Sequence, residues 1–186
     1  MTRIVREEYF DGSKEKIERL GLSPLIHEIK SAIASFQLEI KREVHANGSA
    51  TLRERLDDAL RHVGDWTNTT SGDVDWIKCR LVDGVRVCVG VEVQMSARSD
   101  LIFRDIVHFQ KQMREGQIDV CVEILPSDAL SPYLTDRTPR FSDGVRVIKE
   151  MRADDLPVVL IAIEHDGFCD VPLGKKVTNK GKRTDL

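Results

Sequence analysis

The clearest hydrophobic pattern lies between residues 74 and 94. Valine occupies every second position of one run: Val85, Val87, Val89, Val91 and Val93. This is the period of a β-strand with one buried face. The dipeptide Asp83-Gly84 precedes the run and is typical of a two-residue hairpin turn. The pattern therefore predicts an antiparallel hairpin in which Val82 pairs with Val85.

This register brings three polar side chains together. It places Asp75 directly opposite Glu92, with Gln94 two residues further along the face that carries Glu92. Directly opposed side chains have Cβ atoms about 4.5–5.5 Å apart, and like charges at that separation repel. A divalent cation between the carboxylates would remove the repulsion, so the trio predicts a metal-dependent site. Gly90 on the same face predicts an open surface, and hence a cleft, beside the carboxylates.

Two segments before the hairpin have helical spacing. Residues 14–44 are predicted to be helical with a break at 21–24, where Ser23 is a suitable N-cap and Pro24 a suitable first helical residue. Residues 51–63 form a further predicted helix. Glu54 and Asp58 lie on it and are possible additional acidic residues of the site, although such residues are more often solvated surface charges.

The segments after the hairpin alternate between helical and extended patterns. A helix is predicted over 96–115, a strand over 118–125, a helix over 143–152 and a fully apolar strand over 158–163. A strand, a helix and a strand in succession favour a crossover to a parallel neighbour. The fold class expected is α/β, with a mixed central β-sheet and flanking helices.

Three motifs in this order carry a resemblance to a known family. They are Val74-Asp75-Trp76-Ile77-Lys78, then Val91-Glu92-Val93-Gln94, then 118–126 ending in Ile-Leu-Pro. Over residues 50 to 165 the chain resembles the BglII and BamHI group of type II restriction endonucleases, within the PD-(D/E)XK nuclease superfamily. The resemblance implies a restriction-endonuclease-like core. Most members of that superfamily carry Lys as the third motif residue. The BglII-like branch has Gln, which Gln94 matches.

The resemblance and the residues together predict Mg²⁺-dependent hydrolysis of double-stranded DNA. Asp75 and Glu92, with the Val93 carbonyl, are the expected metal ligands, since Mg²⁺ prefers hard oxygen donors. Gln94 is expected to position the attacking water, but an amide cannot act as the general base.

Recognition of DNA is expected from two other places. The resemblance puts Ser96 and Arg98, after the catalytic strand, near the DNA. The long polar loop 127–141 is a candidate for the major groove, and its named residues are Ser131, Asp136, Arg137 and Arg140. A symmetric cut in both strands predicts a twofold homodimer, with the apolar stripes between residues 24 and 63 as candidate interface, although core packing explains these stripes equally well.

Composition sets limits on these expectations. A chain of 186 residues is expected to form a single nuclease domain over 1–186. Within it, 1–63 is a mainly helical scaffold and dimer region, 73–165 the catalytic core and 175–186 a basic flexible tail. No apolar run has the length of a membrane span or of a signal peptide, so a cytoplasmic protein with no membrane partner is expected. The net charge of −3 does not indicate DNA binding, but it does not exclude a local basic surface.

The four cysteines have no metal-binding spacing. Cys79, Cys88, Cys121 and Cys169 are therefore expected to be reduced, although Cys79 and Cys88 are opposite in the predicted hairpin and a cross-strand disulfide stays open. Other functions also remain open: a structure-specific repair or junction-resolving nuclease of the same superfamily, a non-catalytic DNA-binding module, or a small-molecule hydrolase or interaction protein.

Overall fold

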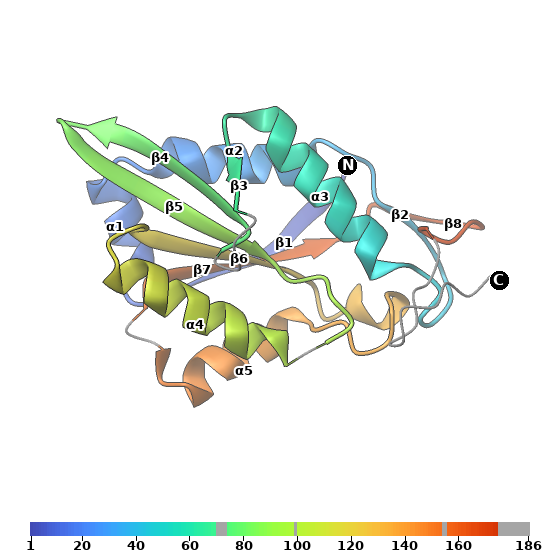
Figure 1. Cartoon of the computed structure of the whole chain (residues 1–186). Coiled ribbons are helices and arrows are strands. Elements are labelled where there is room, and N and C mark those ends of the chain that lie inside the picture. Colours follow the sequence, from blue (N-terminus) through green and yellow to red (C-terminus); the bar gives the residue numbers. More distant parts are fainter. Residues whose placement is uncertain (70–73, 99, 154–155, 175–186) are drawn as a thin grey trace.

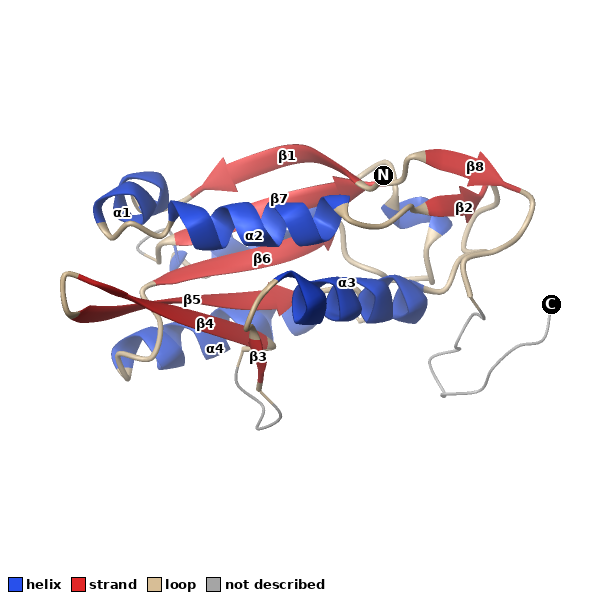
Figure 2. Ribbon diagram, turned by 90° about the horizontal axis from the view of Figure 1, so that it is seen from above, coloured by secondary structure: helices blue, strands red, loops and turns tan. Residues whose placement is uncertain are grey.

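The computed structural model describes residues 1–69, 74–98, 100–153 and 156–174. A six-stranded mixed sheet has the strand order β1-β7-β6-β5-β4-β3, as Figure 2 shows from above. The strands are β1 (Arg3–Tyr9), β3 (Thr67–Asn68), β4 (Trp76–Val82), β5 (Val85–Val93), β6 (Val120–Pro126) and β7 (Val158–Glu164). The central strands β5, β6 and β7 are parallel, and the outer strands are antiparallel to their neighbours. The mixed α/β fold class expected from the sequence is confirmed.

Helices cover both faces of this sheet (Figure 1). The helices α2 (Ser23–Ala34) and α3 (Ser49–Val63) lie on one face, whereas α4 (Leu101–Arg114) and α5 (Phe141–Glu150) lie on the other. The short helix α1 (Ser13–Arg19) connects β1 to this arrangement. Two short parallel strands, β2 (Glu39–Lys41) and β8 (Gly167–Cys169), form a separate sheet, and a 3₁₀ turn, η1, spans Ser131–Tyr133.

The predicted hairpin forms in the predicted register. Val82 pairs with Val85, and the pairing continues to Trp76 and Val91. Both turn residues, Asp83 and Gly84, have positive φ angles of 50° and 80°, as a two-residue hairpin turn of the primed type requires. The predicted inner face is buried against α2 and α3 from Val87 to Val93, whereas Val85 is exposed at the tip of the hairpin.

The N-terminal region differs from the prediction at two strands. The segment expected to be helical over 14–44 contains α1 and α2 but then turns into β2. The edge strand β1 was not predicted, because its residues are mostly partly exposed and show no clean alternation. The break at 21–24 is confirmed, although Leu22 rather than Ser23 is the N-cap of α2. The predicted basic tail, 175–186, lies outside the described residues.

The apolar stripes of α2 and α3 are used within the chain. Ile29, Ile33, Leu52, Leu56 and Leu60 are all buried in the same cluster as the valines of β5. Core packing therefore accounts for the stripes that were the candidate dimer interface. No helix in the described ranges has both the length and the apolar character to cross a membrane.

The expectation that the cysteines are reduced is wrong for two of them. Cys79 and Cys88 are directly opposite in the hairpin, with Cα atoms 4.0 Å apart, and they form a disulfide. Their pairing follows from the register that the Asp83-Gly84 turn sets. Cys121 and Cys169 are free, and Cys121 is buried.

Candidate active site

The carboxyl end of β5 carries Glu92 and Gln94 on the face of the sheet that α4 covers. Both side chains are buried: only 3% of Glu92 and 4% of Gln94 is accessible. Gly90 does not open a cleft, because a Cβ atom there would lie 2.9 Å from the Ile118 side chain. The expectation of an open surface beside the carboxylates is therefore wrong at Gly90.

Asp75 meets Glu92 as the register predicts. The two side chains lie close enough for a hydrogen bond between the carboxyl groups when one of them is protonated. The backbone N–H of Val93 also donates to Asp75 Oδ2 at 2.8 Å. Burial is the main cause that raises the pKa of Glu92 to about 11, and the neighbouring Asp75 adds to this shift. The pKa of Asp75 lies below its usual value, since hydrogen bonds and the nearby Arg53 outweigh the effect of its burial.

Arg53 of α3 brings a positive charge to the same place. Its guanidinium lies 2.8 Å from Asp75 Oδ1 and donates to the Val93 carbonyl at 2.5 Å. It also donates to Asp57 at 2.8 Å, and Asp57 accepts a 2.8 Å hydrogen bond from the Trp76 indole. Arg53 therefore contacts two of the three groups expected to bind metal.

The two acidic residues that the sequence suggested on this helix lie elsewhere. Glu54 and Asp58 are exposed, and Asp58 pairs with Arg61. Arg53 and Asp57 are separated by four residues and so share one side of the helix, and that side faces the site. The neighbouring positions, 54 and 58, are rotated about 100° away from it.

Gln94 is held from both ends of its amide. Its nitrogen donates to Asp105 of α4, and its oxygen accepts hydrogen bonds from the backbone N–H and the hydroxyl of Ser96, at 3.2 and 2.5 Å. These contacts fix which end of the amide faces α4. Asp105 was not singled out from the sequence, because its position on the amphipathic helix carries no motif.

Further ionisable groups lie next to Glu92 beneath α4. His108 Nδ1 is 3.3 Å from Glu92 Oε1, and Glu123 of β6 is the register partner of Glu92. Burial is the main cause that raises the pKa of Asp105 to about 6, and burial also raises the pKa of Glu123 well above its usual value. One ligand atom each from Glu92, Asp105 and His108 lies within 4.8 Å of the others, so this group could also hold a metal ion.

The predicted DNA contacts are spread over two loops. Arg98 is exposed after the catalytic strand and pairs with Asp100 at 2.6 Å. In the loop 127–141, Asp136 and Arg137 are exposed, and Asp136 lies 3.8 Å from His45. Arg140 is exposed before α5 and lies 3.7 Å from Asp143.

Two of the predicted contacts are serines whose hydroxyls have protein partners. Ser96 donates to Gln94, as described above. Ser131 is largely buried, and its hydroxyl donates to the Thr138 carbonyl at 2.8 Å. Ser131 therefore supports the structure of the loop.

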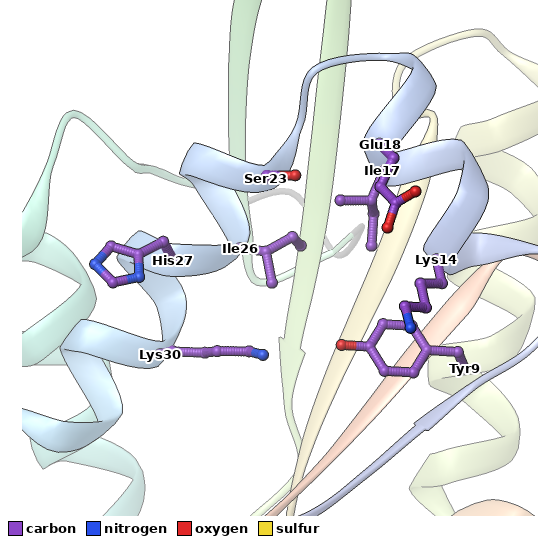
Figure 3. Close-up of a pocket in the computed structure, with 8 residues that line it drawn as sticks. All are labelled: Tyr9, Lys14, Ile17, Glu18, Ser23, Ile26, His27 and Lys30. Atoms are coloured by element: carbon purple, nitrogen blue, oxygen red, sulfur yellow. The ribbon is translucent and has the colours of Figure 1, made fainter.

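A cavity of about 270 Å³ lies away from these carboxylates. Figure 3 shows that Tyr9, Lys14, Ile26 and Lys30 point into it, from β1, α1 and α2. None of its lining residues belongs to the candidate active site. Lys30 forms a 2.7 Å ion pair with Glu7 there.

Comparison with known proteins identifies the family. The family model for restriction endonuclease BglII/BglIII matches residues 10–163, which is most of the chain. The chain belongs to the BglII/BglIII restriction endonuclease family. The match spans β4, β5, α4, β6 and β7, and so includes Asp75, Glu92 and Gln94. A search of curated proteins found no significant match. Membership of this family makes the chain a DNA endonuclease with sequence-specific cleavage.

Proposed function

We propose that this endonuclease makes double-strand cuts by Mg²⁺-dependent hydrolysis, as a twofold homodimer in which each subunit cuts one strand. The observation that carries the proposal is the pair of adjacent carboxyl groups, Asp75 and Glu92, at the end of the catalytic hairpin, each of which shifts the pKa of the other. Two carboxylates and a carbonyl are also the hard oxygen donors that suit Mg²⁺.

The donor set fits the cation, and three groups of the chain would hold it: Asp75, Glu92 and the Val93 carbonyl. When bound, Mg²⁺ would lower the pKa of an attacking water and polarise the scissile phosphate. Asp75 is fixed for this role by the Val93 N–H and by Arg53. Glu92 must release its proton before it can act as a ligand, which makes the site sensitive to pH.

Arg53 and Gln94 have supporting roles in this proposal. The Arg53 guanidinium compensates the charge of Asp75 and donates to the Val93 carbonyl, so its positive charge would repel a cation bound by these two groups. Once displaced, its charge is suited to a phosphate oxygen of DNA. Gln94 is fixed by Ser96 and Asp105 and can orient a water, but it cannot take its proton.

Sequence recognition is assigned to the exposed polar groups of the two loops. Arg98, Arg137 and Arg140 are suited to the bidentate contact with guanine, and Asp136 to accepting from cytosine. The exposure of all four side chains supports this assignment.

Sequencing of fragment ends tests the proposal. The untagged protein is incubated with phage DNA and Mg²⁺, and the ends are mapped. Restriction cleavage predicts the same short sequence at every end. Cuts without a fixed sequence would indicate a structure-specific nuclease of the superfamily, and Mg²⁺-independent binding without cleavage would indicate a non-catalytic DNA-binding module. Either result would overturn the proposal.

A further inference from the structure

Glu123 is a buried carboxyl group without a hydrogen-bonding partner. It lies in the middle of β6 with no exposed surface, and neither of its carboxyl oxygens has a partner among the residues that the structure describes. Buried polar groups are nearly always paired, and an unpaired buried carboxylate is strongly unfavourable. Such a group points to a ligand or a proton that offsets its charge.

The surroundings of Glu123 contain more metal-binding groups. Parallel pairing places Glu123 beside Glu92 on the face that α4 covers. From α4, Asp105 and His108 reach the same place, because residues three apart lie on one side of a helix. Asp105 lies close enough to Glu123 to be the first charge that disfavours its ionisation. Two carboxyl groups and one imidazole therefore converge between β5 and α4, and Glu123 of β6 lies beside Glu92.

Two arginines among the described residues lie near this group. Arg104 lies 3.3 Å from Asp105, and it is on the exposed side of α4. Arg53 pairs with Asp75 and Asp57. For Glu92, the basic neighbour described is His108, at 3.3 Å. A divalent cation would offset the charge that Glu92 and Glu123 carry when ionised.

The distances suit a bound ion. One ligand atom each from Glu92, Asp105 and His108 lies within 4.8 Å of the others. In a site with metal–ligand distances of about 2.1 Å, two ligands on opposite sides of the ion are about 4.2 Å apart. Three ligands evenly spaced around one ion are at most about 3.6 Å apart, so the three groups need to approach one another by up to about 1.2 Å, which rotation of their side chains would supply.

We propose that Glu92, Asp105, His108 and Glu123 form a second cation site, which takes a divalent transition metal such as Mn²⁺. An imidazole nitrogen among carboxylates favours such an ion over Mg²⁺, which binds oxygen ligands. The inference extends the proposed function, because Glu92 is common to both sites and would join the two ions. The second site differs from the first in its nitrogen ligand, and that difference makes it testable without DNA cleavage.

Mn²⁺ binding to the untagged full chain is the test. Binding is followed by the electron paramagnetic resonance signal of free Mn²⁺, and nitrogen ligation by the ¹⁴N modulation of the spin echo. The wild type is expected to bind Mn²⁺ with ¹⁴N coupling. His108→Ala is expected to lose this coupling and bind Mn²⁺ at least about tenfold more weakly, whereas Glu123→Gln keeps the coupling and weakens binding about tenfold.

Two further variants separate this inference from other readings. His62→Ala is the matched control, since His62 is an exposed histidine of α3 and its loss should leave both signals unchanged. Asp75→Asn should keep the nitrogen-coupled ion even if it abolishes cleavage, so failure of the nuclease proposal and failure of this site can be told apart. Absence of ¹⁴N coupling in the wild type, or its survival in His108→Ala, would overturn the second site.

Discussion

Arg53 and Asp75 form an ion pair at 2.8 Å, and the same guanidinium donates to the carbonyl of Val93. One side chain thus contacts two of the three groups proposed to bind metal. A cation that binds Asp75 and the carbonyl has to compete with this arginine. The stability of the metal-free protein and its affinity for metal should therefore change in opposite directions when Arg53 is altered.

Arg53→Ala should lower the free energy of unfolding in chelator by about 1–3 kcal/mol, because it removes the cationic partner of a partly buried carboxylate. It should also raise the affinity for Mg²⁺, so added Mg²⁺ should restore more stability in this variant than in the wild type. Denaturant unfolding with and without Mg²⁺ measures both effects. Arg55→Ala, an exposed position of the same helix, is the control. Equal stabilisation of Arg53→Ala and the wild type by Mg²⁺ would exclude competition.

The stability of the metal-free protein should fall as the pH rises from 5 to 8. Glu92 has a pKa of about 11 in the folded chain, against an ordinary value of 4.5. Over this range the folded protein holds a proton that the unfolded chain has released, and each such proton costs up to about 1.4 kcal/mol per pH unit. Asp105, with a pKa of about 6, also makes the stability fall as the pH rises, up to about pH 6.

Glu92→Gln is the variant that tests this pH dependence. It should be more stable than the wild type at pH 8 and show a smaller slope, because the glutamine amide needs no proton to stay neutral. Glu150→Gln, an exposed carboxylate of α5, should keep the slope of the wild type. Parallel slopes for Glu92→Gln and the wild type would show that Glu92 is ionised in the folded metal-free protein.

Gln94→Ala should bind DNA like the wild type but cleave it at least about tenfold more slowly, since it removes the amide proposed to orient the water. Gln94→Glu should unfold more easily in chelator, because the new carboxylate faces Asp105 where the amide nitrogen now donates. We also expect it to shift the metal preference toward Mn²⁺. Single-turnover cleavage, with binding measured separately, tests the role, and cleavage by Gln94→Ala at the wild-type rate would contradict it.

The homodimer is tested by sedimentation with and without a duplex that contains the mapped cleavage sequence. Two subunits per duplex are expected, because one active site cuts one strand at a time. A monomer on DNA that makes double-strand cuts at limiting enzyme would contradict this arrangement.

The catalytic hairpin could be predicted because its information is local. The Asp83-Gly84 turn and the alternating valines set the register, and the register placed Asp75 opposite Glu92. The edge strand β1 could not be found in this way, since it pairs with β7, more than a hundred residues later in the chain. Its own residues lack the alternation that marks a strand with one buried face.

The remainder of the site depends on how helices sit against the sheet. The sequence suggested Glu54 and Asp58, whereas the rotation of α3 turns Arg53 and Asp57 toward Asp75. Asp105 and His108 come from α4, whose position the sequence does not give. Glu123 could have been noticed in the sequence, because an acidic residue within the apolar run of β6 needs a partner or a proton that offsets its charge.

The central claim is that Asp75 and Glu92 are required for DNA cleavage and are not required for DNA binding. Asp75→Asn and Glu92→Ala should fold, bind duplex DNA at moderate salt, and show no cleavage in Mg²⁺. Glu150→Gln should cleave like the wild type. The decisive measurement is single-turnover cleavage of a duplex carrying the mapped sequence, with binding of each variant measured in parallel. The account predicts a loss of cleavage of at least about a thousandfold with binding retained. Cleavage by either carboxylate variant at the wild-type rate would contradict it.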